Sequence, residues 1–370
     1  MTRLLYLANA ASVHTRRWVN FFANAGHEVH VVTWRKPGTP FSLADSVHLH
    51  RVVCPPQYAM CYGTLLEVMH IVRKIRPDLV HAHYLSHFGI VGGLLSRTTG
   101  FHPLVLTAWG SDVLMQSAGR RRQLVGGALR EADCVTCDSA HMVARLVALG
   151  AALGSVRIVN FGVDTELFRP RGPALDSGLG PRLGSGPVVI SLRNLKPVYD
   201  VATLVRSVPQ VAARFPDVIF LIAGDGGESA MLRALTACLG VSRHVRFLGR
   251  LASDTLPGYL KCADVYVSTS RSDAGIAAST AEAMSCGLPV VVTDFGDNAS
   301  WVKNGETGYL FPCGDENALA QRLIVLLRDA NLRRTLGANG RREIVERNSY
   351  QYEMQKMERI YEDLLERSGR

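Results

Sequence analysis

Short apolar runs alternate with amphipathic stretches along most of the chain. In the first half, five runs have the length and composition of buried strands: 4–9, 28–33, 78–83, 103–109 and 134–137. The segments between them carry apolar residues at helical spacing, and several end at or just before Gly, as helix C-termini often do. Nearly continuous apolar strands separated by helices indicate a parallel sheet that is covered on both faces.

The alternation stops in a stretch rich in Gly, Pro and Ser and then starts again. The second set of expected strands is 187–194, 218–226, 244–249, 263–270 and 289–294. The pattern therefore predicts an α/β protein of two doubly wound, Rossmann-like domains, with ligands at the carboxyl ends of strands and hence in a central cleft between the domains. The expected parts are a first domain (1–165), a linker (166–186), a second domain (187–348) and a terminal helix (349–370).

Composition narrows the class of protein without naming a function. The chain has 370 residues, of which 47% are hydrophobic and 20% charged, as in ordinary soluble proteins. No apolar run reaches the roughly 20 residues that span a membrane, and the N-terminus does not read as a signal peptide. The eight cysteines form no disulfide framework, and Cys134 and Cys137 lack a second pair to complete a zinc site. We expect reduced, structural thiols in a cytoplasmic protein.

Positive charge and histidine are concentrated in the first half. Residues 1–161 carry 16 Lys and Arg against 8 Asp and Glu, and 11 of the 12 histidines. This excess suggests an anionic partner, either a phosphorylated acceptor or a membrane surface; a solvated Arg-rich surface is an equal alternative. A contact with the inner face of a membrane would involve the helix that Arg120–Arg122 begin, with Leu124, Val125 and Leu129 behind them. The chain lacks the aromatic and basic interleaving of RNA-binding proteins, so nucleic acid is not expected.

Polar residues at strand ends in the second half suggest a phosphate site. Arg193 and Lys196 follow a buried strand, where two cations suit a pyrophosphate; exposed loop charges are the plainer interpretation. Gly224, Gly226 and Gly227 precede a helix and form either a weak phosphate loop or a tight turn.

The segment 270–289 is the most informative part of the chain. Small residues lead into a helix-forming run that carries a single carboxylate, Glu282. Such a loop lets backbone N–H groups approach an anion, and Glu282 could accept from sugar hydroxyls, so the segment predicts a nucleotide-sugar site. The sequence has no D-x-D pair and no zinc or Walker motif, so neither a metal nor another cofactor is expected. Arg193 and Lys196 would then stabilise the departing diphosphate.

The candidate acceptor residues lie at strand ends of the first half. His81 and His83 share one face of a strand, and each could serve a site or the structure. Asp112 is either an acceptor for a hydroxyl or a helix N-cap. The loop after the first strand offers further positions that a ligand could reach, among them Ala11 and His14.

These motifs together resemble the retaining glycosyltransferases of family 4, which have the two-domain GT-B fold, over nearly the whole chain. RNLKPVYD resembles the family's donor-phosphate Arg and Lys, NFGVDTELFRP the end of its first domain, and AEAMSCGLPVV with NGETGYLF its most specific part. The resemblance implies that Phe247 and Leu248 meet the nucleotide base and that Glu282 binds the ribose. It also implies that Gly275, Ile276, Ala277 and Ala278 face the phosphates and sugar. The terminal helix would return to the first domain.

Two positions depart from the family pattern. The family often has a glutamate eight positions before the second one, where this chain has Ala274, with Asp273 as the nearest carboxylate. Many relatives also have His at the position of Trp109, so His83 becomes the substitute candidate.

The resemblance implies a metal-independent, retaining hexosyltransferase that moves a sugar from a nucleotide diphosphate, with UDP expected, to a hydroxyl. The acceptor would be a glycan, a glycolipid or a small metabolite, and the leaving phosphate would help to take its proton. The expected catalytic residues are His83, Asp112, Arg193 and Lys196. The expected donor site adds Gly224, Phe247, Leu248, Asp273, Gly275, Ile276, Ala277, Ala278 and Glu282, and the acceptor site comprises Ala11, His14, His83, Trp109 and Asp112. The alternatives are a nucleotide-sugar epimerase of the same architecture and a non-catalytic relative that binds nucleotide sugar.

Overall fold

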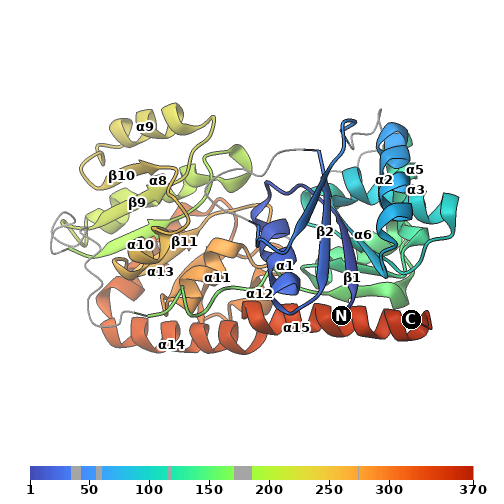
Figure 1. Cartoon of the computed structure of the whole chain (residues 1–370). Helices are drawn as coiled ribbons and strands as arrows, with labels where there is room; N and C mark the ends of the chain where they lie inside the picture. The colour runs from blue at the N-terminus through green and yellow to red at the C-terminus, as the bar shows by residue number, and fades with distance from the viewer. Residues whose placement is uncertain (35–42, 56–60, 115–118, 171–185, 274, 370) are drawn as a thin grey trace. The chain divides into compact units, whose positions relative to one another are not determined.

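The computed structural model describes residues 1–34, 43–55, 61–114, 119–170, 186–273 and 275–369. It forms two compact units of the α/β class, one made of Met1–Phe161 with Glu353–Arg370 and the other of Gly162–Tyr352 (Figure 1). Each unit is a doubly wound parallel sheet, which confirms the predicted fold class. Most of the predicted linker, residues 171–185, lies outside the described residues.

The first unit is built on a seven-stranded parallel sheet in the order β3-β2-β1-β4-β5-β6-β7. Its strands are β1 (Arg3–Leu7), β2 (Glu28–Thr33), β3 (His48–Arg51), β4 (Leu79–His83), β5 (Leu104–Thr107), β6 (Cys134–Cys137) and β7 (Val156–Ile158). Its helices are α1 (Val13–Asn24), α2 (Cys61–Ile75), α3 (Ile90–Thr99), α4 (Ser111–Leu114), α5 (Arg120–Glu131), α6 (Ala140–Leu149) and most of α15 (Tyr350–Arg367). A π-helical turn, Tyr84–Gly89, joins β4 to α3.

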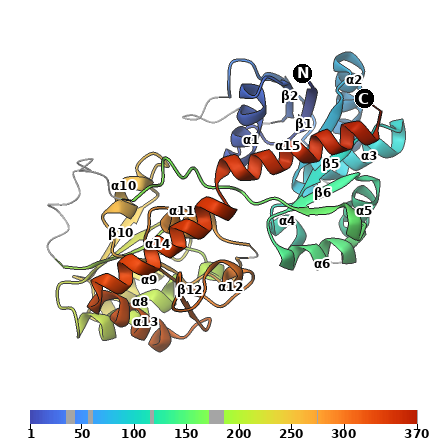
Figure 2. The same cartoon turned by 90° about the horizontal axis from the view of Figure 1, so that it is seen from below.

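The helix α15 is held to the first sheet by buried polar side chains. The Tyr361 hydroxyl lies 2.7 Å from the Tyr6 hydroxyl and 2.5 Å from Nδ1 of His81. Nε2 of His81 lies 2.5 Å from Oγ1 of Thr107, which lies 2.6 Å from Oγ1 of Thr136. This chain of hydrogen bonds joins side chains of four strands, β1, β4, β5 and β6, to α15. Figure 2 shows α15 lying across this sheet. Within the first unit, residues far apart in the sequence therefore share one buried network.

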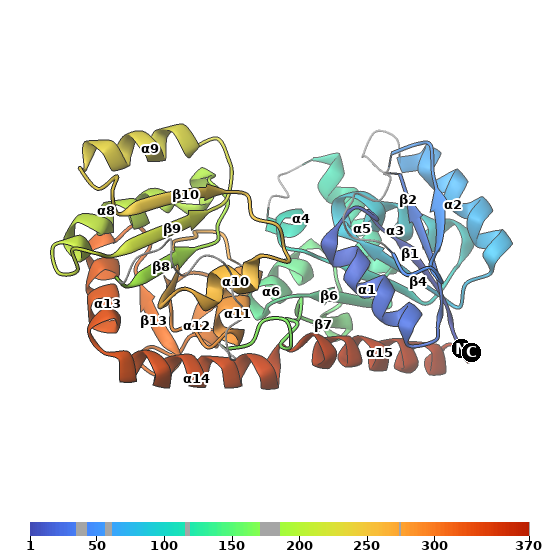
Figure 3. The same cartoon turned by 60° about the vertical axis from the view of Figure 1, so that its left-hand side comes forward.

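The second unit is built on a six-stranded parallel sheet in the order β10-β9-β8-β11-β12-β13. Figure 3 shows β10, β9 and β8 side by side. Its strands are β8 (Val188–Ser191), β9 (Ile219–Ala223), β10 (Val245–Gly249), β11 (Val265–Ser268), β12 (Val290–Thr293) and β13 (Gly308–Phe311). Its helices are α8 (Val201–Ala212), α9 (Ser229–Cys238), α10 (Leu256–Lys261), α11 (Ala278–Ser285), α12 (Asn298–Trp301), α13 (Glu316–Arg328) and α14 (Ala330–Arg347). Alternate residues of the strands enter two cores, Val189 on one face and Val188 and Ile190 on the other, so both faces of the sheet are covered.

Both sheets reverse their strand order beside the first strand. In the first unit β1 lies between β2 and β4, and in the second β8 lies between β9 and β11. At such a switch point the chain leaves neighbouring strands toward opposite faces, which opens a crevice at their carboxyl ends. The loops after β1 and β4, and those after β8 and β11, are therefore the places where each unit is expected to hold a ligand.

The helix α5 offers less to a membrane than its sequence suggests. Arg120–Arg122 are exposed, but Val125 and Leu129 are buried in the first unit and are not available to a lipid surface. None of the helices in the described ranges combines the length and the apolar character needed to cross a bilayer.

Candidate functional site

In the second unit, the switch point is occupied by a buried ion pair. Arg193 follows β8 and Asp273 follows β11, and a guanidinium N–H of Arg193 donates to Oδ1 of Asp273 over 2.5 Å. The Arg193 guanidinium also lies over the ring of Tyr199, 4.6 Å from its centre. Burial acts to lower the pKa of Arg193, but Asp273 together with Tyr266 and Tyr199 outweighs it, so the pKa is raised and the side chain stays charged.

The two carboxylate oxygens of Asp273 differ in their hydrogen bonds within the described residues. Its Oδ1 accepts from Arg193 and from the hydroxyl of Ser270, whereas Oδ2 is buried and has no hydrogen-bond partner in the part of the chain that the structure describes. A buried, unpaired carboxylate oxygen is costly, so a site that leaves one is suited to a ligand that donates to it.

Close packing of neighbouring loops sets the position of Arg193. Gly224 has φ +153°, and a Cβ there would lie 2.2 Å from the carbonyl oxygen of Arg193. Gly226 is similarly constrained, because a Cβ would lie 2.1 Å from the carbonyl oxygen of Leu195. These contacts support a tight turn for this Gly-rich loop, and they bring Gly224 directly beside the Arg193 backbone. A further hydrogen bond holds Tyr199, whose ring lies against the Arg193 guanidinium: Oγ1 of Thr269 donates to the carbonyl oxygen of Tyr199.

The segment after Asp273 leads into α11, as the sequence predicts, although Ala274 lies outside the described residues. Ala277 is the N-cap residue, with extended backbone and no side-chain cap, so its helix begins with N–H groups that no capping side chain takes. Glu282 is half-buried about one turn into the helix, and Gly275, Ile276 and Ala278 surround the helix start.

The remaining predicted donor residues lie at the same carboxyl edge of the second sheet or beside it. Lys196 is exposed on the loop after β8. Phe247 and Leu248 are half-buried near the end of β10, where the pairing with β9 shifts register between Phe247 and Gly249. Such a bulge re-aims the backbone at a strand end.

In the first unit, the switch point holds a pocket of about 240 Å³. Asn9 and Ser12 reach it from the loop after β1, and Trp34 reaches it from the end of β2. The segment after β4 contributes His83, Tyr84, His87 and Phe88. Three of these seven side chains are aromatic and none carries a carboxylate, an ammonium or a guanidinium group.

The structure gives His81 and His83 different surroundings, whereas the sequence alone does not distinguish them. Both nitrogens of His81 are engaged in the network under α15. His83 lines the pocket; its Nδ1 lies 3.5 Å from Oγ1 of Thr15, and its Nε2 is buried without a partner. Burial, with a smaller contribution from His14, lowers the pKa of His83 to about 3, so His83 is neutral at physiological pH.

Trp109 and His14 form an aromatic cluster next to His83. The His14 and Trp109 rings stack at 4.6 Å, and the Trp109 ring meets that of His83 edge-on at 5.5 Å. Burial, followed by the charge of Arg17, lowers the pKa of His14 to about 4. Nδ1 of His14 and Nε1 of Trp109 are buried without partners. Ala11 lies in the same loop as His14, and its N–H donates to Oδ1 of Asn9.

Asp112 joins two loops of the first unit. Its carboxylate accepts from the backbone N–H of Leu85 over 2.8 Å and from that of Trp109 over 2.9 Å. Burial raises its pKa to about 6, although backbone hydrogen bonds, beginning with that from Leu85, act in the opposite direction. The observed contacts are thus those of a residue that positions Trp109 and the turn after β4.

Three aromatic residues of the pocket are not predicted from the sequence: Trp34, Tyr84 and Phe88. Trp34 could be found only by knowing that β2 lies next to β1. Tyr84 directly follows His83, but its φ of +67° and the π-helical turn that it begins leave no mark in the sequence. Both features are uncommon and concentrate at functional sites.

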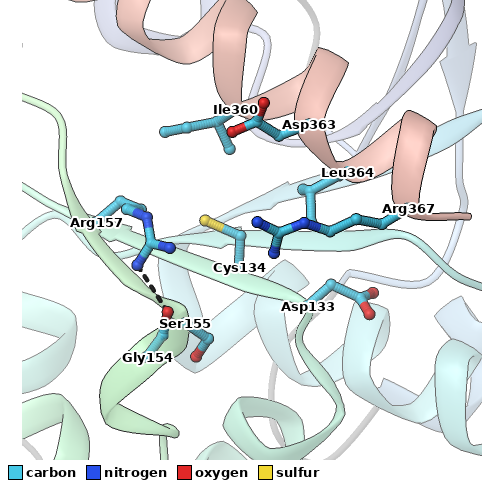
Figure 4. A pocket seen from close by; sticks show the side chains of 9 residues that line it. All are labelled: Asp133, Cys134, Gly154, Ser155, Arg157, Ile360, Asp363, Leu364 and Arg367. Carbon is cyan, nitrogen blue, oxygen red and sulfur yellow. Dashed lines mark hydrogen bonds between the residues drawn. The ribbon is translucent and has the colours of Figure 1, made fainter.

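A second pocket of the first unit lies at the opposite edge of the sheet, where β6 begins (Figure 4). Figure 4 shows the guanidinium groups of Arg157 and Arg367 on either side of Cys134, with Asp133 and Asp363 nearby. The two positive and two negative side chains balance, and the carboxyl end of α15 beside them disfavours an anion. Burial raises the pKa of Cys134 to about 12, so its thiol is not a nucleophile. This pocket contains none of the predicted site residues.

Comparison with known proteins identifies the family. The model of "Glycosyl transferases group 1" matches residues 181–343, and that of "Glycosyl transferase 4-like" matches residues 3–139. A GDP-mannose-dependent alpha-(1-6)-phosphatidylinositol monomannoside mannosyltransferase of Mycobacterium tuberculosis is 31% identical over 79% of this chain and 78% of its own length. An N-acetyl-alpha-D-glucosaminyl L-malate synthase of Bacillus anthracis is 25% identical over 93% of this chain and 91% of its own.

Solved structures agree on the fold. Sucrose-phosphate synthase from Thermosynechococcus elongatus has a TM-score of 0.83 at 22% identity and covers 98% of this chain and 99% of its own. Anabaena Alr3699/HepE in complex with UDP has a TM-score of 0.84 at 19% identity, covering 98% and 100%. The fold is that of GT-B glycosyltransferases. The chain belongs to the group 1 glycosyl transferases of family 4, and it is a glycosyltransferase.

Proposed function

We propose that the second unit binds a nucleoside diphosphate sugar, with UDP as the nucleotide, and that the sugar is transferred with retention of its anomeric configuration. The observation that carries this proposal is the buried Arg193 at the switch point of the second sheet, beside a helix start without a side-chain cap. A guanidinium and free backbone N–H groups together suit a diphosphate.

Each donor residue then has a definite task. Arg193, joined by the exposed Lys196, stabilises the diphosphate as the bond to the sugar breaks, and the transfer needs no metal ion or other cofactor. The N–H groups around Gly275, Ile276, Ala277 and Ala278 face the phosphates and the sugar. Glu282 accepts from the ribose hydroxyls, while the segment of Phe247 and Leu248 receives the base, next to Gly224.

Asp273 takes the place of the glutamate that the family often has one position later. Its unpaired Oδ2 supports this role, because a hydroxyl of the donor sugar can donate to it. Once the diphosphate draws the Arg193 guanidinium, the Asp273 carboxylate is left to orient the sugar.

The acceptor binds the first unit, where His83, His14 and Trp109 line or adjoin the pocket and Ala11 lies in the loop beside it. Asp112 positions this region and His83 contacts the acceptor hydroxyl. The hydroxyl attacks from the face that the diphosphate leaves, and the leaving phosphate takes its proton. Nothing in the comparisons favours the epimerase alternative.

Substitution of the two cations tests the donor site. The variant Arg193→Ala/Lys196→Ala should lose most donor turnover and the rise in melting temperature that UDP causes. Arg206→Ala, an exposed cation on α8, is the matched control and should keep both. Unchanged turnover in the double variant would remove the phosphate assignment, and unchanged nucleotide affinity in Glu282→Gln would remove the ribose assignment.

The nucleotide and the acceptor need separate experiments. A thermal-shift comparison of UDP-, GDP- and ADP-sugars identifies the base, because only a ligand that binds the folded state raises its melting temperature. GDP is the main competitor, since a relative is named as GDP-mannose-dependent. A lipid-linked acceptor with peripheral membrane contact would rest on the exposed Arg120–Arg122, and cosedimentation with anionic vesicles that is lost at high salt would support it.

A further inference from the structure

The pocket of the first unit has walls suited to a ring. Trp34, Tyr84 and Phe88 contribute aromatic surface, and Asn9, Ser12 and His83 contribute hydrogen-bonding groups. Aromatic faces carry partial negative charge and attract the polarised C–H bonds of a flat, hydroxylated ring. The volume of about 240 Å³ is below the roughly 300–1,000 Å³ of pockets for drug-sized ligands. It therefore suits one small ring.

The backbone of the pocket is held in an uncommon conformation. Tyr84 has φ +67°, which is rare for a bulky residue, and the π-helical turn Tyr84–Gly89 starts at the same residue. Asp112 fixes this turn by accepting from the N–H of Leu85. Conformations of this kind persist where the surrounding structure enforces them, commonly at ligand sites.

The charge of the pocket restricts its ligand. Among the residues that line it in the described part of the chain, none is Lys, Arg, Asp or Glu. His83 supplies no cation, because its pKa of about 3 keeps it neutral. Among these lining side chains a dicarboxylate or a phosphate would find no counter-charge to offset the loss of its hydration, which disfavours an anion against them.

We propose that this pocket binds the acceptor of the reaction as an uncharged, polyhydroxylated ring, a pyranose or a cyclitol. The inference rests on the proposed function, in which the first unit holds the acceptor. The apolar face of the ring packs on Trp34 and Tyr84, and a ring hydroxyl pairs with Nε2 of His83, which has no hydrogen-bond partner among the described residues. A hydroxyl both donates and accepts, so it satisfies either tautomer of the imidazole. Any charged or lipid part of the acceptor would extend outside this pocket.

Binding of small probes to the full chain tests the proposal. Saturation-transfer NMR with UDP present should detect methyl α-D-glucopyranoside, methyl α-D-mannopyranoside or myo-inositol in preference to L-malate and methyl phosphate, all of which have carbon-bound protons to observe. Trp34→Ala should weaken the ring probe about tenfold, as loss of an aromatic platform implies. Tyr62→Ala removes an aromatic ring, 62% exposed on α2 and not lining the pocket, and should leave binding unchanged.

Three results would overturn the proposal. The first is binding of L-malate or methyl phosphate at least as tight as that of every neutral ring. The second is no binding of any ring at tens of millimolar, and the third is a ring affinity that Trp34→Ala leaves unchanged. The UDP-induced rise in melting temperature, measured on the same samples, reports on the donor unit separately. Its absence would count against the proposed function itself and not against the choice of acceptor.

Discussion

The ion pair of Arg193 and Asp273 is the single contact most directly tied to the proposed donor chemistry. Asp273→Asn leaves the buried guanidinium without its carboxylate, so we expect a loss of about 2–4 kcal/mol in the free energy of unfolding. A bound diphosphate would restore the missing negative charge. UDP should therefore raise the melting temperature of this variant by more than it raises that of the unaltered protein.

The control for this prediction is Asp200→Asn, which removes an ion pair with Arg271; the Arg271 side chain is 51% exposed, whereas that of Asp200 is 12% exposed and also accepts from the Thr203 hydroxyl. We expect a smaller loss of stability than in Asp273→Asn, because the arginine of this pair stays in contact with water, and the UDP response should stay as in the unaltered protein. Equal UDP responses in Asp273→Asn and the unaltered protein would mean that the diphosphate does not meet Arg193.

Asp112 gives a prediction on pH. Its folded-state pKa of about 6 lies above the ordinary 3.8, so the folded protein holds this proton more tightly than the unfolded chain. The stability that this proton brings is complete below pH 3.8 and is lost as the pH rises through 6. Asp112→Asn does not titrate there. Between pH 4 and 7 the free energy of unfolding of the unaltered protein should fall by about 2–3 kcal/mol relative to that of the variant, as measured by thermal unfolding. If the difference in stability between the unaltered protein and the variant stayed constant over this range, Asp112 would not be the group that holds this proton.

At the residue scale, the sequence predicts that Arg193 reaches the carboxyl edge of the second sheet, but it cannot distinguish His81 from His83. The distinction depends on Tyr361, which lies 280 positions from His81 in the chain and occupies one of its ring nitrogens. Likewise, the bond from Arg193 to Asp273 joins residues that are 80 positions apart. A strand-end pattern indicates which side chains reach the edge of a sheet, but their pairing depends on how the strands are ordered.

At the scale of elements, the loop after β9 controls where Arg193 lies. Gly224→Ala would put a Cβ 2.2 Å from a backbone oxygen and at φ +153°, so the two loops must move apart. We expect a loss of about 2–4 kcal/mol in stability and a larger loss of nucleotide affinity, measured by thermal unfolding and by titration with UDP.

The matched control is Gly227→Ala in the same loop, where an added Cβ meets nothing within 4 Å. This variant should change neither stability nor nucleotide affinity appreciably. If both alanine variants behaved alike, the close packing of the two loops would not be what positions Arg193.

The sequence predicts the inner strands of both sheets and one edge strand, β10. It does not predict the edge strands β3, β7 and β13, which have only three or four residues each; β3 reads HLHR and is largely exposed. The π-helical turn after β4 is also unpredicted, since its residues fit an ordinary helix equally well. Periodicity therefore finds the inner strands of each sheet and β10, but it misses the three other edge strands and the irregular turn at the pocket.

At the scale of the molecule, the chain does not divide into two consecutive halves. Glu353–Arg370 belong to the compact unit of residues 1–161, and the reason lies in particular contacts. The buried carboxylate of Glu353 accepts from the backbone and side-chain N–H groups of Asn160, while Tyr361 joins the network of Tyr6 and His81. The amphipathic pattern of α15 indicates a helix with a buried side, but the partner of that side depends on these long-range hydrogen bonds.

Since each unit has its own sheet and its own core, we expect calorimetry to resolve two unfolding transitions that can be shifted independently. Tyr361→Phe removes a buried hydroxyl with two partners, which should cost about 1–3 kcal/mol and lower only the transition of the first unit. UDP should raise only the transition of the second unit. The control is Tyr352→Phe on the same helix. Tyr352 is 44% exposed and belongs to the second unit, so this variant should leave the transition of the first unit unchanged. If UDP and Tyr361→Phe instead shifted one common transition, the two units would unfold together, and binding at the donor site would also stabilise the acceptor pocket.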